Sequence, residues 1–385
     1  MPDQATLNHA AQVLGSLGAN QRADTALRLY FERHRYLPPT VKRAVSRAVF
    51  IYFRWLGWLD PKTSPQKCVG QALVLHERFL ADEKSVKTEA LAARAVPAWL
   101  ASEMELPDGW LRQLQREPAL WLRARPGTAA SLSKSLFACE PTDRAPDALR
   151  FTGTQDLFKT EQFKTGEFEI QDLASQRVGL ACAPRSGENW WDACAGEGGK
   201  SLHLADLMAN QGVVWATDRS ARRLDTLKRR FARAKLFNYR TDFWDGGPKL
   251  PTKQKFDGIL VDAPCSGVGT WQRNPHARWT VTPDDVRELA ATQRALLDHV
   301  AGSLKPGGRL IYAVCTLTRS ETTDVAAAFT AAHPELEPAP GLSSSAATSV
   351  TLWPQELNAN GMFIAAWQRP NPSSDKLKQE TMKPG

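Results

Sequence analysis

The chain has 385 residues, of which 42% are apolar, 9% aromatic and 23% charged. This composition excludes a wholly disordered, collagen-like or coiled-coil protein, and the length predicts two or three domains. The formal net charge of +8 fits a polyanionic partner such as nucleic acid, and it fits a well-solvated basic surface equally well.

Residues 5 to about 95 have the pattern of helices. In the clearest one, VKRAVSRAVFIYFRWLGWLD, apolar side chains recur in steps of three and four residues, and Pro38 and Pro39 precede it as a start signal. We expect residues 1–95 to form an all-α domain. Its basic side chains form either an RNA-docking face or a solvated surface, and three of them fall off the apolar face of this helix: Arg43, Arg47 and Arg54.

Residues 96–170 are predicted to hold linker helices and a small α/β subdomain. Prolines separate short amphipathic pieces such as GWLRQLQRE, whereas LWLRARP and ALRFTGT are typical of strands.

Residues 171–370 alternate between apolar runs and helical stretches. The runs NWWDACA, VVWATD, FDGILVDAP and GGRLIYAVCT are separated by helices expected from Gly199, over 220–235 and over 284–303. This alternation predicts an α/β fold with a doubly wound parallel sheet, to which GMFIAAWQR adds a last strand. The run APGLSSSAATS is expected to be a loop, and residues 371–385 a disordered tail.

The first strand of this sheet runs into a glycine-rich turn, DACAGEGGKS. Glycines at 196, 198 and 199 allow a tight turn and a close approach to a ligand at the start of a helix. The turn is neither a Walker loop nor a dinucleotide fingerprint, so it is either an ordinary strand–helix turn or part of a nucleotide-type site.

Three aspartates end or follow successive strands. Asp218 ends the second strand, where a carboxylate can bind a ribose diol, and Asp242 follows the third, where it can accept from an adenine amino group. Aspartate is also a common helix N-cap. Together with Asp192, the pattern favours an adenosyl ligand.

Two cysteines, Cys265 and Cys315, follow two further strands, at the edge where such sheets bind ligands. A thiolate that adds to carbon 6 of cytosine makes carbon 5 able to attack a sulfonium methyl group, and a second acid–base group helps release the product. Asp262 can stabilise charge on the ring or act as a charge partner. Chemical logic alone leaves open which cysteine is the nucleophile.

The words QDLASQRVG, DACAGEGGKS, FDGILVDAPCSGVGTWQRNPHARW and LIYAVCT closely resemble the Nop/Sun family of RNA cytosine-C5 methyltransferases over roughly residues 166–370. The N-terminal helices resemble the NusB-like extension of a bacterial 16S rRNA enzyme of that family. The resemblance implies a Rossmann-like, S-adenosylmethionine-dependent sheet, preceded by an all-α NusB-like domain and the small α/β segment.

The resemblance also implies roles for single residues. Cys315 would be the nucleophile, Cys265 would assist proton abstraction and release, and Asp262 and Lys200 would act at the base. The following residues would bind the cofactor S-adenosyl-L-methionine: Ala193, Cys194, Ala195, Gly196, Glu197, Gly198, Gly199, Lys200, Asp218, Arg223, Asp242 and Asp262.

The chain departs from the family pattern at a few positions. Glu197 stands where proline is usual, VCT replaces TCS, and NGMF replaces DGFF. No proposed catalytic group is lost, so the departures bear more on substrate identity than on reaction type.

Basic residues interleaved with aromatics follow the first cysteine, in WQRNPHARW. Such a pattern suits loop or single-stranded RNA, and we expect Arg273, His276 and Arg278 to contact it. The earlier run TLKRRFARAKLFNYR is more typical of a solvated amphipathic helix.

The expected activity is methylation of cytosine in rRNA, with tRNA as the second substrate class and an inactive RNA-binding or ribosome-assembly protein as the alternative outside enzymes. An amino-group methyltransferase would carry an Asn/Asp-Pro-Pro-Tyr/Phe motif where this chain has DAPC. No metal motif, signal peptide or membrane span is visible, and cysteine spacing shows no C-x-x-C. We expect a soluble, cytoplasmic monomer without disulfides or a catalytic metal.

Overall fold

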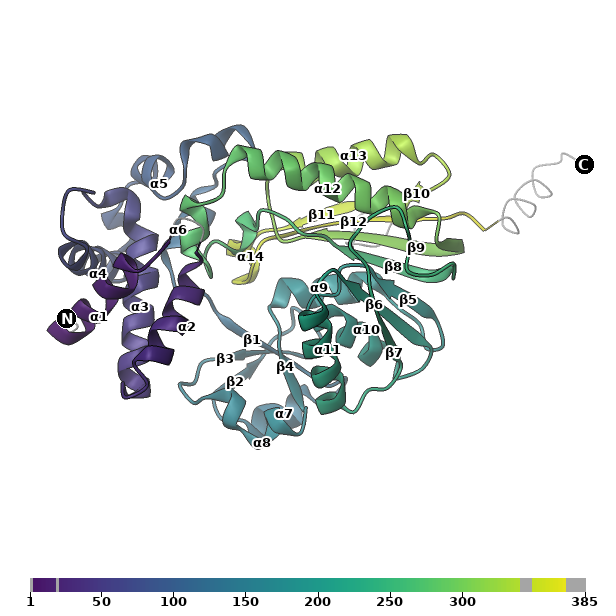
Figure 1. The fold of residues 1–385 in the computed structure, drawn as a ribbon, viewed down its shortest axis with the longest axis horizontal. Helices are drawn as coiled ribbons and strands as arrows, with labels where there is room; N and C mark the ends of the chain where they lie inside the picture. Colours follow the sequence, from purple (N-terminus) through teal and green to yellow (C-terminus); the bar gives the residue numbers. More distant parts are fainter. Residues whose placement is uncertain (1–2, 19–20, 340–347, 372–385) are drawn as a thin grey trace, which may run out of the picture. The chain divides into compact units, whose positions relative to one another are not determined.

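The computed structural model describes residues 3–18, 21–339 and 348–371. The chain forms two compact units that are interleaved in sequence: residues 1–118 with 267–283, and residues 119–266 with 284–385 (Figure 1). The chain therefore leaves the second unit directly after Ser266 and returns to it at Asp284.

The first unit is helical. Its helices are α1 (Gln4–Gly15), α2 (Ala23–Arg33), α3 (Pro39–Trp55), α4 (Pro65–Ala81), α5 (Thr88–Arg94) and α6 (Asp108–Gln115), with the short helices η5 (Val268–Thr270) and η6 (Pro275–Trp279) from the later segment. The apolar side chains of α1 to α4 form one core, against which Trp279 also packs. The indole N–H of Trp279 donates to the carbonyl of Phe53 at 2.8 Å, so the later segment is tied to α3.

The second unit begins with a small sheet. Its strands are β1 (Leu120–Ala124), β2 (Cys139–Pro141), β3 (Ala148–Phe151) and β4 (Phe168–Ile170), in the order β2-β3-β1-β4, all antiparallel. The helices α7 (Ala129–Ser135) and α8 (Glu161–Lys164) belong to the same part of the chain. The strands expected in LWLRARP and ALRFTGT are confirmed as β1 and β3.

A larger sheet follows, in the order β10-β12-β9-β8-β5-β6-β7, with β11 paired to β12. Its central strands are parallel and β12 is antiparallel to β9, which confirms the Rossmann-like α/β fold. The strands are β5 (Asn189–Asp192), β6 (Val213–Asp218), β7 (Tyr239–Phe243), β8 (Phe256–Asp262), β9 (Leu304–Val314), β10 (Glu337–Pro338), β11 (Ser349–Leu352) and β12 (Met362–Gln368).

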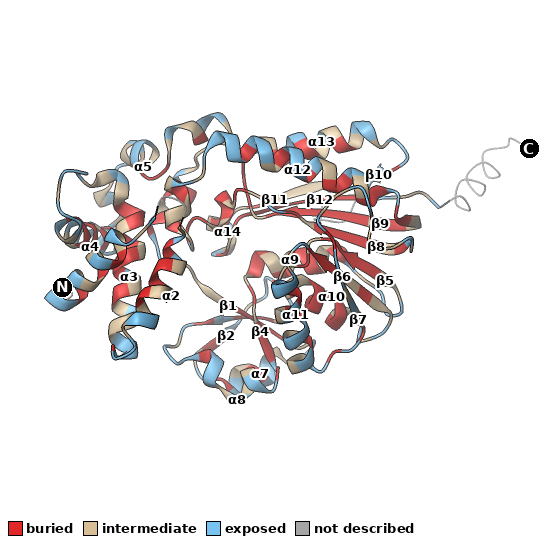
Figure 2. Ribbon diagram, in the orientation of Figure 1, coloured by how far each residue is buried: buried red, intermediate tan, exposed pale blue. Residues whose placement is uncertain are grey.

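Helices cover both faces of this sheet. They are α9 (Leu173–Cys182), α10 (Gly199–Leu207), α11 (Ala221–Ala234), α12 (Pro283–Ala301), α13 (Thr323–Ala332) and α14 (Pro354–Leu357). Because neighbouring side chains of a strand point to opposite faces, Trp190 joins the core under α9, α10 and α11, whereas Trp191 joins the core under α12 and α13. The central strands are buried on both sides (Figure 2).

The boundaries differ from those expected from the sequence. Residues 96–118 belong with the N-terminal helices, because α6 buries Trp110, Leu111 and Leu114, and residues 119–170 belong with the large sheet. The expected loop APGLSSSAATS lies mostly outside the described residues, as does the expected tail except for Asn371. No helix among the described residues has both the length and the apolar character needed to cross a bilayer.

Candidate active site

The turn between β5 and α10 depends on glycine. Gly198 has φ +82°, and a Cβ there would lie 2.5 Å from Cγ of Leu227, so only glycine fits. Gly196 has φ +55°, and a Cβ there would meet nothing within 4 Å, so the backbone faces open space. The turn thus presents accessible backbone at the start of α10, as a small-molecule site requires.

Asp218 holds this turn from the neighbouring strand. Its Oδ2 accepts from the N–H of Gly196 at 2.9 Å, and its Oδ1 accepts from the N–H of Ser220 at 2.8 Å. Nη1 of Arg223 lies 4.0 Å from Oδ2. Each carboxylate oxygen has a second lone pair, which can accept from a hydroxyl group of a ligand.

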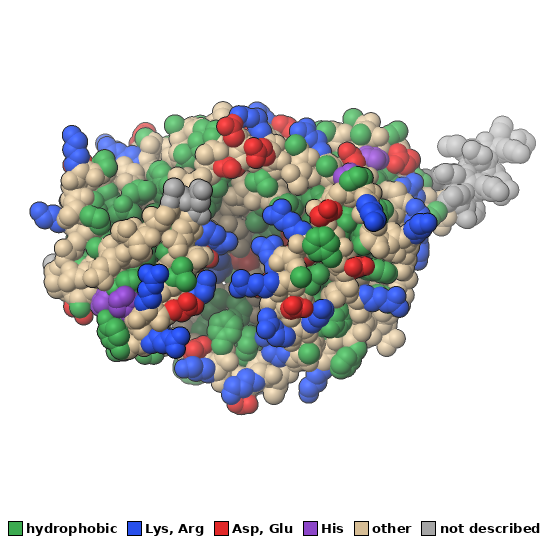
Figure 3. Space-filling model, viewed as in Figure 1, with side chains coloured by type: hydrophobic (Ala, Val, Ile, Leu, Met, Phe, Trp, Pro, Cys, Tyr) green, Lys and Arg blue, Asp and Glu red, His purple; other side chains and the backbone are tan. Residues whose placement is uncertain are grey.

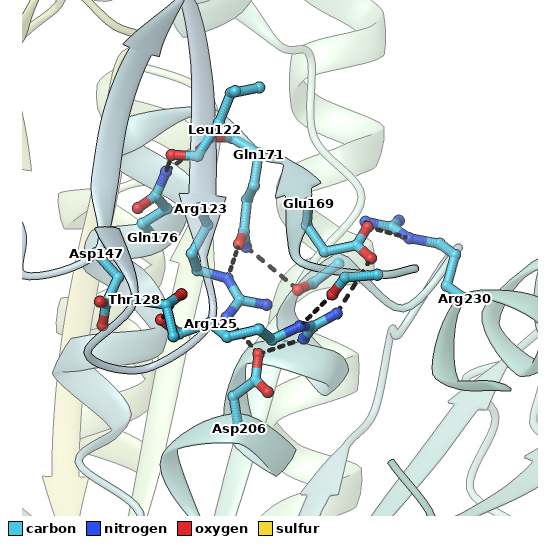
Figure 4. A network of polar contacts seen from close by, with 12 residues as sticks. Leu122, Arg123, Arg125, Thr128, Asp147, Glu169, Gln171, Gln176, Asp206 and Arg230 are labelled. Carbon is cyan, nitrogen blue, oxygen red and sulfur yellow. Dashed lines mark hydrogen bonds and ion pairs between the residues drawn. The ribbon is translucent and has the colours of Figure 1, made fainter. Parts of the chain in front are cut away.

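A buried polar network supports the same turn from the small sheet (Figure 4). Glu169 on β4, 2% exposed, accepts two hydrogen bonds from Arg230 of α11, and Arg230 also donates to the carbonyl of Glu197 at 3.1 Å. Arg123 on β1 donates to Gln171, whose amide donates to the carbonyl of Gly199 at 3.2 Å. The small sheet therefore fixes both sides of the glycine-rich turn.

Two carboxyl groups end the neighbouring strands β5 and β8. Asp192 is fully buried and accepts from the hydroxyl of Ser201 at 2.6 Å, and burial raises its pKa to about 7. Asp262 is more exposed, and its Oδ2 lies 2.6 Å from Nζ of Lys200. Burial alone would lower the pKa of Lys200, but the carboxylate of Asp262 outweighs it and raises the pKa.

Cys265 and Cys315 come together, although 50 residues separate them. Cys265 follows β8 and Cys315 follows β9, and because these strands are parallel neighbours their carboxyl ends meet. The two Sγ atoms lie 3.3 Å apart, a hydrogen-bonded thiol pair rather than a disulfide. This hydrogen bond lowers the pKa of Cys315, against the effects of burial and of Asp262, while Lys200 also lowers it.

The other residues expected at the cofactor lie along the same strand ends. Asp242 is exposed in β7, where it pairs with Thr217, and Glu197 is exposed on the turn. Ala193 and Ala195 are held by backbone hydrogen bonds to Leu260 and Thr217. Cys194 is half-buried, and burial raises the pKa of its thiol.

The three residues expected to contact RNA lie in the first unit and differ from one another. Arg273 is exposed, and His276 is half-buried with its ring edge-on to Phe53. Arg278 is fully buried, and its guanidinium donates to the carbonyls of Trp271, Ala95 and Leu114. The expectation that Arg278 contacts RNA is therefore wrong, because its N–H groups already donate to buried carbonyl groups.

Sequence reasoning missed residues that act through others. Glu169 and Arg230 are charged residues in ordinary-looking runs, and Glu321 follows the second cysteine by six positions without any recognised motif. Phe243 is 57% exposed at the end of β7 beside Asp242, where its ring can stack on a base. In the sequence, the available signal was an aromatic residue directly after Asp242, at the end of the expected third strand.

Residues 179–368 match the family model described as 16S rRNA methyltransferase RsmB/F. The probable ribosomal RNA small subunit methyltransferase B of Bacillus subtilis is 40% identical over 202 residues, which cover 52% of this chain and 45% of the relative. The ribosomal RNA small subunit methyltransferase B of Shewanella oneidensis is 32% identical over 289 residues, covering 70% and 66%. The chain thus spans about half to two thirds of these relatives.

Solved structures share the fold. The structure of PH0851 has a TM-score of 0.75 and 22% identity, and it covers 95% of this chain and 99% of its own. A methyltransferase homolog protein from Pyrococcus horikoshii has a TM-score of 0.60 and 25% identity, over 68% of this chain and 90% of its own.

Proposed function

We propose that this chain, whose residues 179–368 match the family model of 16S rRNA methyltransferase RsmB/F, transfers a methyl group from S-adenosylmethionine to carbon 5 of a cytosine in RNA. The observation that carries this proposal is the pair of thiols 3.3 Å apart at the carboxyl ends of β8 and β9. Few methyl transfers need two adjacent thiols, whereas methylation of a cytosine ring at carbon 5 uses one to add and one to release.

The residues around the glycine-rich turn fit S-adenosylmethionine, which supplies the sulfonium methyl group. The open backbone at Gly196 suits a ligand that approaches closely. Asp218 has lone pairs for the ribose hydroxyls, and Asp242 and Phe243 stand at the end of β7, where the adenine would lie. Arg223 and the residues from Ala193 to Lys200 complete the set.

In the proposed mechanism, Sγ of Cys315 adds to carbon 6 of the cytosine, and its lowered pKa favours the thiolate that this step needs. Carbon 5 then forms a bond to the methyl group as the bond from methyl to sulfonium breaks. The thiolate of Cys265 accepts the proton from carbon 5, and the electron pair of that carbon–hydrogen bond forms the double bond between carbons 5 and 6. The bond between Sγ and carbon 6 breaks as the double bond returns, and the electron pair goes back to Cys315.

Asp262 and Lys200 would orient the base. Asp262 keeps a partly exposed carboxylate beside the thiols, where it can accept from the exocyclic amino group of cytosine. Lys200 holds this carboxylate in place at 2.6 Å and adds a positive charge near Cys315, which stabilises the thiolate.

RNA binding is proposed for two basic surfaces. In the first unit, a pocket of about 650 Å³ is lined by Arg273 and Phe50, a combination suited to a phosphate and a base. Arg22 and Arg47 also line it, paired with the carboxylates of Asp24 and Glu117. In the second unit, Figure 3 shows basic side chains over the part of the molecule where Figure 1 draws α11. The exposed basic residues of α11 are Arg222, Arg223, Lys228 and Arg229. Arg230 and Arg233 are excluded, because both bind Glu169.

The first unit is proposed to be a NusB-like RNA-binding domain. The whole chain is proposed to act as a cytoplasmic monomer on small-subunit rRNA.

The direct test is transfer of labelled methyl from S-adenosylmethionine to unmodified small-subunit rRNA and to bulk tRNA, side by side. We expect label in rRNA, recovered as 5-methylcytosine, and loss of at least about 1,000-fold in the Cys315→Ala variant, because the covalent route is closed. Cofactor affinity, measured by calorimetry, should change less than twofold.

Other outcomes would change the proposal. Label in tRNA alone would keep the chemistry and overturn the substrate. Full activity in the Cys315→Ala variant would overturn the nucleophile. Absence of both label and cofactor binding would favour an inactive RNA-binding protein.

A further inference from the structure

Glu321 is a fully buried residue of η7 (Arg319–Glu321), behind the two cysteines. Its carboxylate accepts hydrogen bonds from five neutral donors: the N–H of Ser266 at 2.8 Å, the hydroxyl of Ser266, the hydroxyl of Thr316 at 3.2 Å, the hydroxyl of Thr318 at 2.7 Å and the amide of Gln293 at 3.0 Å. A buried carboxylate is costly unless its oxygens are satisfied, and here every donor is fixed by the fold.

The donors come from both cysteine loops. Ser266 is the residue after Cys265, and Thr316 is the residue after Cys315, and their hydroxyl oxygens also lie 2.8 Å apart. Gln293 of α12 donates to the carbonyl of Pro264 as well, and Tyr312 of β9 donates to the carbonyl of Glu321 at 2.6 Å. The single carboxylate thus joins Ser266 and Thr316, the residues that directly follow the two reacting thiols.

We propose that Glu321 is a positioning residue that sets the spacing of Cys265 and Cys315 and so keeps the two thiols within hydrogen-bond distance. The five hydrogen bonds to its carboxylate come from residues other than the two cysteines. The proposal rests on the roles proposed above for the cysteines. In this role, both carboxylate oxygens of Glu321 must accept hydrogen bonds.

The groups that shift the pKa of Cys315 indicate that Glu321 acts through the spacing of the thiols and not through its own charge. Cys315 is influenced by Cys265 from the loop after β8, by Asp262 from β8 and by Lys200 from α10. The hydrogen bonds of Glu321 go to other residues. A change at Glu321 should therefore alter Cys315 through the distance between the thiols.

The test compares Glu321→Gln with the wild type, with Glu288→Gln, an exposed glutamate of α12, as the matched control. Glutamine fills the same volume but turns an NH₂ group toward donors, which separates the loops. The rate at which iodoacetamide alkylates Cys315 is followed against pH by peptide mass spectrometry. Binding of S-adenosylmethionine and kcat are measured in parallel.

We expect the alkylation midpoint of Cys315 to rise in Glu321→Gln, and kcat to fall about tenfold or more with cofactor affinity within about twofold, because the thiolate is less favoured. Glu288→Gln should match the wild type. If Glu321→Gln does not fold, Thr318→Val removes one donor to the carboxylate and should give the same changes to a smaller degree.

An unchanged alkylation profile would overturn the proposal, whether or not activity falls, since a merely structural role could lower activity without moving the thiol. The alkylation needs neither RNA nor methyl transfer. Failure of the proposed function would appear instead as full methylation by Cys315→Ala, which leaves this measurement valid.

Discussion

Asp192 and Asp262 show how two aspartates at neighbouring strand ends acquire different properties. Asp262 stays a charged partner of Lys200, whereas Asp192 lies in the interior with the hydroxyl of Ser201, and burial raises its pKa from 3.8 to about 7. Between pH 3.8 and about 7, Asp192 keeps its proton in the folded protein but loses it in the unfolded chain. The contribution of Asp192 to the free energy of unfolding is therefore complete below pH 3.8 and is lost as the pH rises to about 7.

Asp192→Asn should remove the loss of stability that ionisation of Asp192 causes at higher pH. The variant should gain stability relative to the wild type as the pH rises from 4 to 7, by roughly 4 kcal/mol at most, because asparagine never ionises and its Oδ1 still accepts from Ser201. Urea unfolding at pH 5 and pH 8 measures the difference, with the exposed Asp225→Asn of α11 as control. A difference that is the same at both values would contradict the assignment.

Single residues that carry chemistry were predictable, and residues that hold them were not. The cysteines and aspartates stand directly at strand ends, where the topology of a parallel sheet brings them together. Glu321 and Glu169 act through contacts between segments distant in sequence, 55 residues for Glu321 with Ser266 and 61 for Glu169 with Arg230. No local pattern encodes such contacts.

At the scale of elements, the glycine-rich turn is supported by a strand outside its own sheet. Glu169 of β4 is surrounded by guanidinium groups from Arg230, Arg233 and Arg125. Burial would raise the pKa of Glu169, but these arginines outweigh it and hold the pKa below 4.5. Arg230 of α11 also donates to the carbonyl of Glu197, so this helix helps to hold the turn in place.

Glu169→Gln should weaken cofactor binding by about three- to tenfold and lower the melting temperature by several degrees, because buried guanidinium groups lose their anionic partner. Equilibrium binding of S-adenosylmethionine and a thermal scan measure both. Glu161→Gln on α8, an exposed glutamate paired with Lys164, should change neither. Unchanged affinity with a lower melting temperature would limit Glu169 to a structural role.

Helix α3 shows where periodicity misleads. One apolar face was expected, yet Val49, Ile51, Phe53 and Arg54 are buried as well. At Phe53 and Arg54 the reason is that the segment 267–283 packs there, with the ring of His276 edge-on to Phe53. Arg54 donates there to the carbonyl of Gln272 at 2.9 Å, so a residue expected on a solvated or RNA-docking face is an internal one.

At the scale of the whole molecule, the interleaving of the two units could not be predicted from the sequence. Residues 267–283 stand between the strand FDGILVDAP and the helix expected over 284–303, so nothing in the sequence pattern marks the segment as part of the first unit. Within this segment, Arg273 and Arg278 lie five residues apart and have different roles. Arg278 joins α6, the end of α5 and its own segment, whereas Arg273 lines the basic pocket.

Arg278→Met should therefore lower the melting temperature by about 5 °C or more, because three carbonyl groups lose their donor. Arg273→Met should leave the melting temperature within about 1 °C and weaken RNA binding, with a shallower dependence on salt because a phosphate contact is lost. Thermal scans and filter binding at several salt concentrations separate the two. Equal effects of both substitutions on stability would contradict this division.

The measurement that tests the account most directly is the search for a covalent adduct in Cys265→Ala. The thiol that assists release is absent, so the protein incubated with small-subunit rRNA and S-adenosylmethionine should accumulate a species that migrates slowly on a denaturing gel. Digestion should locate the RNA on the peptide that contains Cys315. The paired-thiol mechanism would be contradicted if Cys265→Ala gave no slow band. It would also be contradicted if the band persisted when Cys315 is replaced by alanine as well.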